Sequence, residues 1–362
     1  MSAPTVPVLF QPTAVGSFAL AHRVVLAPLT RFRAQPDGAP GAHTATYYAQ
    51  RAVVPGTLLI SEATFIAPFA GGYRGVPGLW SEAQVEGWKR VTQAVHERGS
   101  RIFCQLWALG RGADPAVLDE GGFPYVSVSG ICLSAVIDML SAYVDAYASA
   151  ARNAVRAGFD GVELHGANGY LIDQFLQDVS NNRTDAYGGF IENRARFALE
   201  VIEGVSNSIG AERTAIRFSP WNDVQDMRMK DPKPQFAYVV SQIAQRFPTL
   251  AYIHVIESRV SGFLLVQREP PPDETNDFIR EIWSPRPLIS AGGHTRESAL
   301  EFSAKGDLVA FVRLFISNPD LPLRLAKDLP LAKGDRGTYY TPGPEGYIDY
   351  PFADDDFAKL YI

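Results

Sequence analysis

The segment His165-Gly166-Ala167-Asn168-Gly169-Tyr170 holds side chains suited to polarising a carbonyl group and moving a proton. His165 and Asn168 can both donate hydrogen bonds to one oxygen atom. The phenol of Tyr170 can give up a proton. The alternative for this segment is a capping turn with a packed histidine. A hydrolase is not favoured, because there is no Gly-x-Ser-x-Gly motif and no histidine lies beside Cys104 or Cys132 in the sequence.

A second group of polar side chains lies at the ends of other expected strands. Thr30 follows the first strand, Gln105 lies in the third and Arg217 lies in the fifth. Together they suit the polar edge of a flat, hydrogen-bonding ring, and Arg217 could hold negative charge on that ring. The set would accommodate a flavin, although spacing alone does not name the ring.

A phosphate site is expected where the seventh and eighth strands end. Gly292 and Gly293 let backbone N–H groups approach an anion, and the guanidinium of Arg313 supplies charge and a fork of donors. Arg313 interrupts the apolar run 308–316, of which we assign residues 308–315 to the eighth strand. A buried arginine needs an anionic partner, so the alternative is a structural ion pair. The pattern predicts a phosphorylated ligand or cofactor.

These residues require a scaffold of alternating strands and helices. The expected strands are residues 24–29, 57–64, 101–107, 161–165, 214–218, 250–256, 287–291 and 308–315. The expected helices are residues 46–52, 83–98, 137–157, 194–209, 235–247, 276–283, 296–305 and 321–327. Such alternation predicts a parallel sheet with right-handed crossovers. Eight units favour a single (β/α)8 TIM barrel over residues 1–362, whose active site lies at the carboxyl ends of the strands.

A doubly wound sheet is the alternative fold, and it would place a glycine-rich fingerprint after the first strand. The sequence there reads Leu29-Thr30-Arg31-Phe32 instead. Long loops follow the third strand (residues 110–135) and the fourth (residues 166–193). The aromatic-rich extension at residues 334–362 is expected to pack on the barrel.

Composition excludes several classes of protein. The chain has 362 residues, 46% of them hydrophobic, and a net charge of -6 with no long basic run, which argues against a nucleic-acid binder. Two cysteines form no disulfide framework and no zinc-type spacing, so no metal is expected. Neither a signal peptide nor an apolar run of about 20 residues is visible, so we expect a cytoplasmic protein without a membrane span.

The chain resembles the old yellow enzymes, the FMN-dependent ene-reductases, over nearly its whole length. The matching segments are Ala27-Pro28-Leu29-Thr30-Arg31, Ala70-Gly71-Gly72-Tyr73, Cys104-Gln105-Leu106-Trp107, residues 165–171, residues 182–189, residues 192–197 and residues 315–320. Their order makes the match specific, and the fungal and plant branches of the family look most similar. The resemblance implies a ping-pong enzyme, active as a monomer or homodimer. It would use NADPH or NADH to reduce the C=C bond of α,β-unsaturated ketones, aldehydes or nitroalkenes through FMN.

The resemblance also implies roles for individual residues. His165 and Asn168 match the pair that holds the substrate oxygen, and then the nicotinamide in turn, while Tyr170 matches the proton donor. Trp107, Tyr73 and Tyr340 match positions that shape the substrate pocket. The positions that match cofactor contacts are Pro28, Leu29, Thr30, Ala63, Gln105, Arg217, Gly292, Gly293, Val312 and Arg313.

Three departures from the family pattern stand out. Val312 occupies a position that is usually glycine, which bears on phosphate geometry. The stretch from Ser129 to Asp138 is shorter than usual, and Arg111 and residues 223–233 follow no pattern that we can assign to a substrate. Two other functions remain open. One is a flavin-dependent double-bond isomerase, which Tyr170 argues against. The other is a non-flavin barrel enzyme acting on a phosphorylated substrate.

Overall fold

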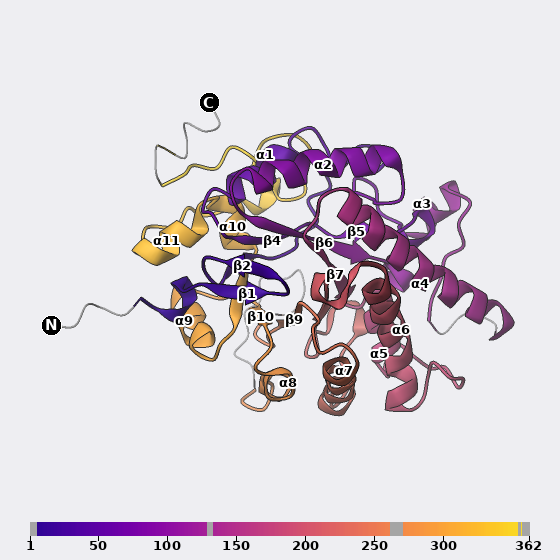
Figure 1. Cartoon of the computed structure of the whole chain (residues 1–362). Helices are drawn as coiled ribbons and strands as arrows, with labels where there is room; N and C mark the ends of the chain where they lie inside the picture. The colour runs from indigo at the N-terminus through magenta and orange to yellow at the C-terminus, as the bar shows by residue number, and fades with distance from the viewer. Residues whose placement is uncertain (1–5, 129–132, 261–270, 354–355, 357–362) are drawn as a thin grey trace.

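The computed structural model describes residues 6–128, 133–260, 271–353 and 356. Its central feature is a closed barrel of eight parallel strands, confirming the expected fold (Figure 1). In barrel order the strands are β3 (Val24–Leu26), β4 (Leu58–Ile60), β6 (Arg101–Trp107), β7 (Gly161–Gly166), β8 (Thr214–Phe218), β9 (Tyr252–Ile256), β10 (Leu288–Ala291) and β11 (Leu308–Phe311). Pairing of β4 with β6 and of β11 with β3 closes the ring. Because both faces of such strands are covered, they read as apolar runs in the sequence.

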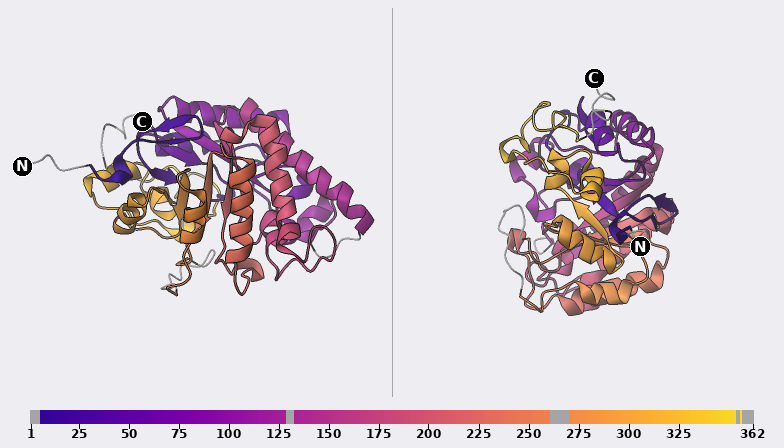
Figure 2. Two further views of the ribbon diagram at one scale, coloured as in Figure 1. Left: turned by 60° about the horizontal axis from the view of Figure 1, so that its bottom comes forward. Right: turned by 90° about the vertical axis from the view of Figure 1, so that its left-hand side faces the viewer.

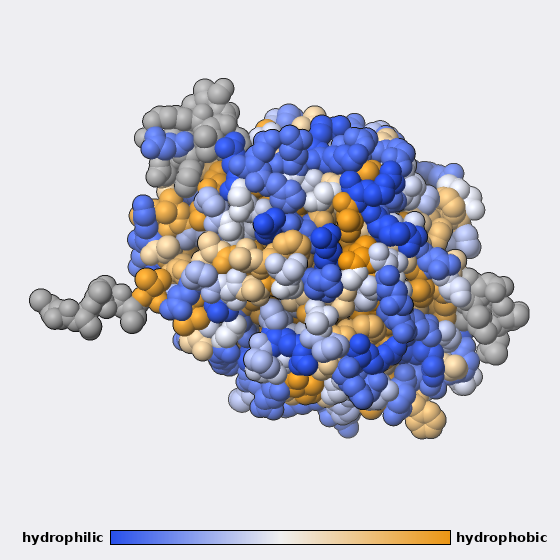
Figure 3. Space-filling view, in the orientation of Figure 1, coloured by the Kyte–Doolittle hydropathy of each residue, from blue (hydrophilic) through white to orange (hydrophobic). Residues whose placement is uncertain are grey.

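Helices form the outer layer of the barrel (Figure 2). The longer ones are α1 (Thr44–Arg51), α2 (Glu82–His96), α4 (Leu133–Arg156), α6 (Ile191–Ile209), α7 (Lys233–Arg246), α8 (Asp277–Trp283), α9 (Arg296–Ala304) and α11 (Leu321–Lys327). Val85, Trp88, Val91 and Val95 form the expected apolar stripe of α2, and all are buried. Figure 3 shows mostly hydrophilic side chains over the outward surface of α2, as this amphipathic pattern requires.

The amino end of the barrel carries an antiparallel hairpin that the sequence analysis missed. It consists of β1 (Thr13–Val15) and β2 (Phe18–Leu20). Val15 and Leu20 are buried against inward-facing residues of the barrel strands. The ring of Phe18 meets that of Phe103 edge-on, with their centroids 6.2 Å apart. The hairpin therefore closes the end of the barrel opposite to the expected site.

Three expected strands end earlier than the apolar pattern indicated, and the first of them stops at Leu26. The second stops at Ile60, and the chain resumes as the short β5 (Thr64–Phe65). The eighth stops at Phe311, so the assignment of Arg313 to this strand is wrong. Val312, with φ −107° and ψ −75°, turns the chain, and Arg313 opens the short helix α10 (Arg313–Ser317). Its side chain is half-buried rather than enclosed between strands.

The described part of the carboxyl-terminal extension, residues 334–353, packs on the barrel as expected, and most of the remainder of residues 354–362 lies outside the described residues. Arg31 donates hydrogen bonds to the carbonyl oxygens of Tyr339 (2.9 Å) and Gly346 (2.8 Å). The ring of Tyr347 is buried and stacks on Tyr47 of α1, with a centroid distance of 4.2 Å. Since Arg31 follows the first barrel strand, these contacts bring the end of the chain to the rim next to Thr30.

We expect Ser81→Ala to lower the free energy of unfolding by about 1 kcal/mol. The Ser81 hydroxyl accepts a hydrogen bond from the backbone N–H of Gln84 (3.3 Å), and Gln84 Oε1 accepts one from the backbone N–H of Ser81 (3.1 Å). This reciprocal cap satisfies two N–H groups at the start of α2. Urea denaturation followed by circular dichroism measures the change. Glu86→Ala, on the exposed face of the same helix, is the control and should have a smaller effect. Equal effects of the two changes would contradict a capping role.

Candidate functional site

The carboxyl ends of neighbouring strands bring most of the expected site residues to one rim. Gln105 lies on β6, His165 on β7 and Arg217 on β8, and these three strands are adjacent in the barrel. His165 is in register with Arg217. The ring of His165 stacks on that of Trp107, with their centroids 5.9 Å apart. Residues far apart in the sequence therefore share one side of the barrel mouth.

A buried carboxylate beneath this rim orients Gln105. Glu163 accepts hydrogen bonds from Gln105 Nε2 (2.7 Å) and His254 Nδ1 (2.8 Å). Burial alone would raise the pKa of Glu163, but His254, Arg217 and Gln105 hold it below its usual value. Because the Gln105 amide N–H points at Glu163, its Oε1 remains as an acceptor. Glu163 could have been noticed in the sequence, since it lies two positions before His165 and shares its face of the strand.

The guanidinium of Arg217 has an N–H group at this rim that is available to a ligand. Its side chain is buried, and its Nε has no hydrogen-bond partner in the described part of the chain. A buried polar group normally finds a partner, so this atom points to a bound group. With the acceptor of Gln105 and the hydroxyl of Thr30, it fits the carbonyl and N–H edge of a flavin ring.

His165 is neutral, and one nitrogen of its ring can donate a hydrogen bond. Burial, together with the positive charge of Arg217, holds its pKa well below the usual value. The backbone N–H of Ala167 lies 3.4 Å from Nδ1 and can only donate to it. The ring proton therefore resides on Nε2, the nitrogen left to face a ligand.

The Asn168 backbone is fixed in the left-handed region at φ 59°. Its N–H donates to Ser219 Oγ (2.8 Å), and its carbonyl oxygen accepts from Gln225 Nε2 (2.8 Å). Its side-chain Oδ1 accepts from Asn222 Nδ2 (2.6 Å). The side-chain Nδ2 of this half-buried residue is therefore the group available to a ligand. Sequence reasoning missed Ser219, Asn222 and Gln225 because nothing in their spacing links them to Asn168.

Tyr170 is enclosed by aromatic rings. Its ring lies edge-on to Trp107 (4.7 Å between centroids) and to His165 (5.1 Å). Burial raises the pKa of Tyr170 above its usual value, so the phenol keeps its proton. The rings of Trp107, His165 and Tyr170 form an aromatic wall. Tyr73 extends this wall toward the outside, with its ring centroid 5.9 Å from that of Trp107. The wall combines a protonated hydroxyl with apolar surface.

Tyr340 reaches the same region from the carboxyl-terminal extension. Its ring centroid lies 5.9 Å from that of Phe32, which in turn lies 6.4 Å from that of Tyr73. The hydroxyl of Tyr73 donates to the carbonyl oxygen of Gly112 in the loop after β6. Pocket-forming residues expected from three separate segments are thus linked through aromatic contacts.

Opposite this wall, the ends of β10 and β11 form the candidate anion site. Gly292 (φ 126°) and Gly293 (φ 69°) adopt conformations that favour glycine. Burial and the neighbouring Arg336 lower the pKa of Arg313, so two cationic groups lie close together. No acidic side chain among residues 6–128, 133–260 and 271–353 forms an ion pair with Arg313. This arrangement favours a phosphate ligand over the alternative of a structural ion pair.

Arg111 and the loop at residues 223–233, which the sequence left unassigned, contact each other. Arg111 donates a hydrogen bond to the carbonyl oxygen of Gln225. Gln225 (φ 58°), Asp226 (φ 59°) and Arg228 (φ 95°) all adopt left-handed conformations although none is glycine. The contact joins the loops after β6 and β8 above the rim. Residues 129–132, within the stretch noted as short, lie outside the described residues.

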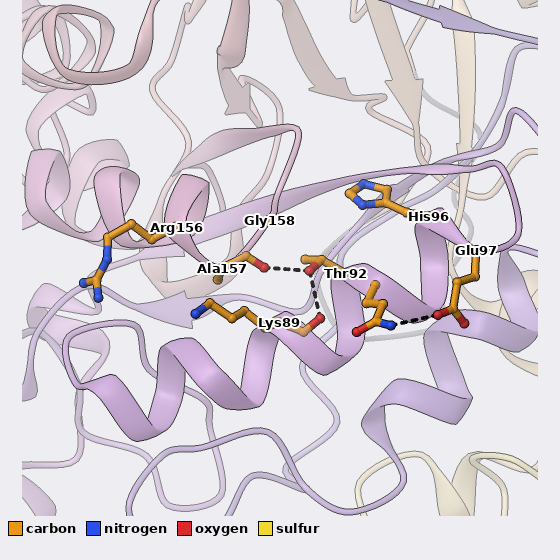
Figure 4. A pocket seen from close by; sticks show the side chains of 8 residues that line it. Lys89, Thr92, His96, Glu97, Arg156, Ala157 and Gly158 are labelled. Atoms are coloured by element: carbon orange, nitrogen blue, oxygen red, sulfur yellow. Dashed lines mark hydrogen bonds between the residues drawn. The ribbon is translucent and has the colours of Figure 1, made fainter.

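A surface depression lies elsewhere on the molecule (Figure 4). Lys89, Thr92 and His96 of α2 line it, facing the end of α4 at Arg156. His96 Nε2 lies 2.9 Å from a carboxylate oxygen of Asp160, the residue that precedes β7. The depression therefore lies toward the amino ends of the strands, away from the polar rim.

In the described residues, no cluster of metal-ligating side chains is present and no helix could cross a membrane.

Comparison with known proteins gives consistent matches. Residues 8–332 match the family described as "NADH:flavin oxidoreductase / NADH oxidase family". The chain is 50% identical over 360 residues to a chanoclavine-I aldehyde reductase of Penicillium roqueforti, covering 95% of this chain and 96% of that protein. An Old Yellow Enzyme from Pichia sp. superposes with a TM-score of 0.87 at 37% identity, over 96% of this chain and 94% of that one. Morphinone reductase gives a TM-score of 0.88 at 38% identity, over 98% and 99%.

Proposed function

Because this chain belongs to the NADH:flavin oxidoreductase / NADH oxidase family, we propose that it is an FMN-dependent ene-reductase. Its reductant is NADPH or NADH, and its substrates are α,β-unsaturated ketones, aldehydes or nitroalkenes. The observation that carries the proposal is the rim at β7, where two neutral hydrogen-bond donors stand beside a protonated phenol. Similarity to a chanoclavine-I aldehyde reductase supports an aldehyde among the substrates.

The cofactor residues divide between the ring and the phosphate. Gln105 Oε1 would accept from the ring N–H, while Arg217 and Thr30 would donate to its polar atoms. Gly293 and Arg313 would hold the phosphate. The remaining assigned contacts are Pro28, Leu29, Ala63, Gly292 and Val312. When bound, FMN supplies the hydride chemistry between the nicotinamide and the β-carbon of the substrate.

The protein's own task is to hold the substrate oxygen and supply a proton. His165 Nε2–H and Asn168 Nδ2–H donate to that oxygen and stabilise the negative charge that develops there. Tyr170 Oη–H protonates the α-carbon. The rings of Trp107, Tyr73 and Tyr340 shape the pocket around the substrate. A cytoplasmic location and a monomeric or homodimeric state remain predictions.

The purified protein is expected to be yellow, with the absorption bands of non-covalently bound FMN. It should oxidise NADPH or NADH and reduce cyclohexenone under anaerobic conditions. Heat denaturation should release the cofactor into the supernatant, where chromatography identifies it. A protein that stays colourless after incubation with FMN would overturn the proposal and favour a non-flavin barrel enzyme.

Val312→Gly is expected to tighten FMN binding by roughly threefold to tenfold, which corresponds to about 1 kcal/mol. Val312 directly precedes Arg313, and its branched side chain is half-buried at the point where the chain leaves β11. Removing that side chain lets the backbone come closer to a phosphate. Titration of the apoprotein with FMN, followed by fluorescence quenching, measures the change. An unchanged dissociation constant would show that the site already accommodates the valine.

A further inference from the structure

We propose that Asn222, in the loop after β8, is a positioning residue that determines which end of the Asn168 amide faces the substrate. The inference rests on the proposed function, in which Asn168 donates a hydrogen bond to the substrate oxygen. Asn222 is buried, with 3% of its surface exposed, so it does not itself line an open pocket. Its effect on the reaction therefore passes through Asn168.

The orientation of both amides follows from one backbone N–H group. The N–H of Val224 lies 2.9 Å from the Asn222 side chain and can only donate, so Asn222 turns its Oδ1 toward it. Asn222 Nδ2 must then point the other way, toward the Asn168 side chain 2.6 Å away. Because Nδ2 can only donate, the Asn168 atom that it meets is Oδ1. Asn168 Nδ2 is left facing outward as a donor.

The backbone of Asn168 is bonded to residues other than Asn222. Ser219 accepts from its N–H and Gln225 donates to its carbonyl oxygen, which together fix its left-handed conformation. Asn222→Asp, which still accepts from the Val224 N–H and so keeps the turn that presents Gln225, should therefore leave the position of Asn168 in place and change only the rotation of its amide. This separation allows a positioning role to be distinguished from a general structural one.

A reversed Asn168 amide would place Oδ1 against the substrate oxygen. Two acceptors would then meet at the atom where negative charge develops. Loss of one such donor typically lowers kcat by about 10²–10³-fold. The same reversal would weaken the binding of any ligand that presents a carbonyl oxygen, whether or not it reacts.

Two substitutions of Asn222 separate polarity from volume. Asn222→Asp keeps the shape and still accepts from Val224 N–H, but its carboxylate cannot donate to Asn168. It should reverse the Asn168 amide and slow cyclohexenone reduction at pH 8 by about 10²-fold. Asn222→Ala releases the amide without reversing it, and the loss should be about tenfold. If Asn222 only filled space, the near-isosteric aspartate would be the milder change.

The experiment measures single-turnover reduction of cyclohexenone and the dissociation constant of cyclohexanone, the saturated product, in the FMN-loaded protein. FMN content and circular dichroism establish that each variant is folded and loaded. In an Asn168→Ala background, Asn222→Asp should change either quantity by less than about twofold, because coupled residues are not additive. A substantial further loss in that background would overturn the inference.

The outcomes separate this inference from the proposed function. A parent protein that neither binds cyclohexanone nor reduces cyclohexenone overturns the proposed function, and this inference with it. A parent that does both, with variants in which alanine is as harmful as aspartate or worse, overturns this inference alone. The inference is supported if the parent reduces cyclohexenone fastest and binds cyclohexanone most tightly, the alanine variant is weaker in both measurements, and the aspartate variant is weakest.

Discussion

Replacing Tyr170 by phenylalanine is expected to slow single-turnover reduction of cyclohexenone by about 10²–10⁴-fold. The oxidation of NADPH in the preceding half-reaction should stay within a few-fold of the parent rate, since that step needs no proton from the protein. The Tyr170 phenol is buried, and burial holds its pKa above the usual value, so it keeps the proton that the α-carbon requires. Phenylalanine preserves the ring that packs edge-on against Trp107. Stopped-flow absorbance of the flavin follows both half-reactions.

Matched controls distinguish proton donation from packing. Tyr73→Phe also removes one hydroxyl from the same wall. That hydroxyl donates a hydrogen bond to the carbonyl oxygen of Gly112, so the rate of cyclohexenone reduction should change little. The rate of nitroalkene reduction should fall less in Tyr170→Phe, because a nitronate can leave the enzyme and be protonated in water. His165→Ala or Asn168→Ala should weaken both half-reactions. A Tyr170→Phe protein that reduces cyclohexenone at the parent rate would show that the proton comes from another group.

Arg313→Ala is expected to weaken FMN binding by about 10- to 150-fold while leaving the apoprotein folded. A hydrogen bond to a charged group contributes about 1.5–3 kcal/mol, which corresponds to that range. Arg313 lies beside Arg336, so removing one of two like charges should not destabilise the apoprotein. FMN content after gel filtration, measured alongside circular dichroism, tests both halves of this expectation.

Arg324→Ala is the matched control for a structural arginine. The Arg324 guanidinium pairs with Asp320 (2.6 Å) and donates to the carbonyl oxygen of Pro351 (2.9 Å). Its removal should lower thermal stability and leave FMN affinity unchanged, the opposite pattern to Arg313→Ala. Full FMN occupancy in Arg313→Ala would show that Arg313 has another partner. Loss of both the flavin and the circular dichroism signal would point to a structural ion pair instead.

The barrel could be predicted because its buried parallel strands stand out as short apolar runs between amphipathic helices. The bounds expected for β6 and β8 are those of the structure. The eighth strand was extended too far because Phe315 and Ile316 of α10 are also buried, so the apolar run continues through the turn. Hydrophobicity alone cannot separate a short buried helix from a strand. The hairpin β1–β2 was missed because its strands have three residues each.

The site was predicted in part. The segment from His165 to Tyr170 indicates its chemistry by its residue types alone, and the structure places the rings of His165 and Tyr170 5.1 Å apart. The residues that orient Asn168 were missed because they come from the loop after β8. Asn222 lies 54 positions from Asn168, and His254 lies 91 positions from Glu163. The parallel pairing of β7 with β8 and of β8 with β9 brings such residues into contact, and the spacing of these residues in the sequence does not indicate it.

Arg31 is synthesised 308 residues before Tyr339, whose carbonyl oxygen it binds. Chains begin to fold from the amino terminus while synthesis continues. The strands and helices of the barrel can therefore assemble before the wall at Tyr340 has been made. A chain whose synthesis stops before Tyr340 would keep the side of the pocket formed by Tyr73, Trp107 and Tyr170 and would lack the side formed by Tyr340.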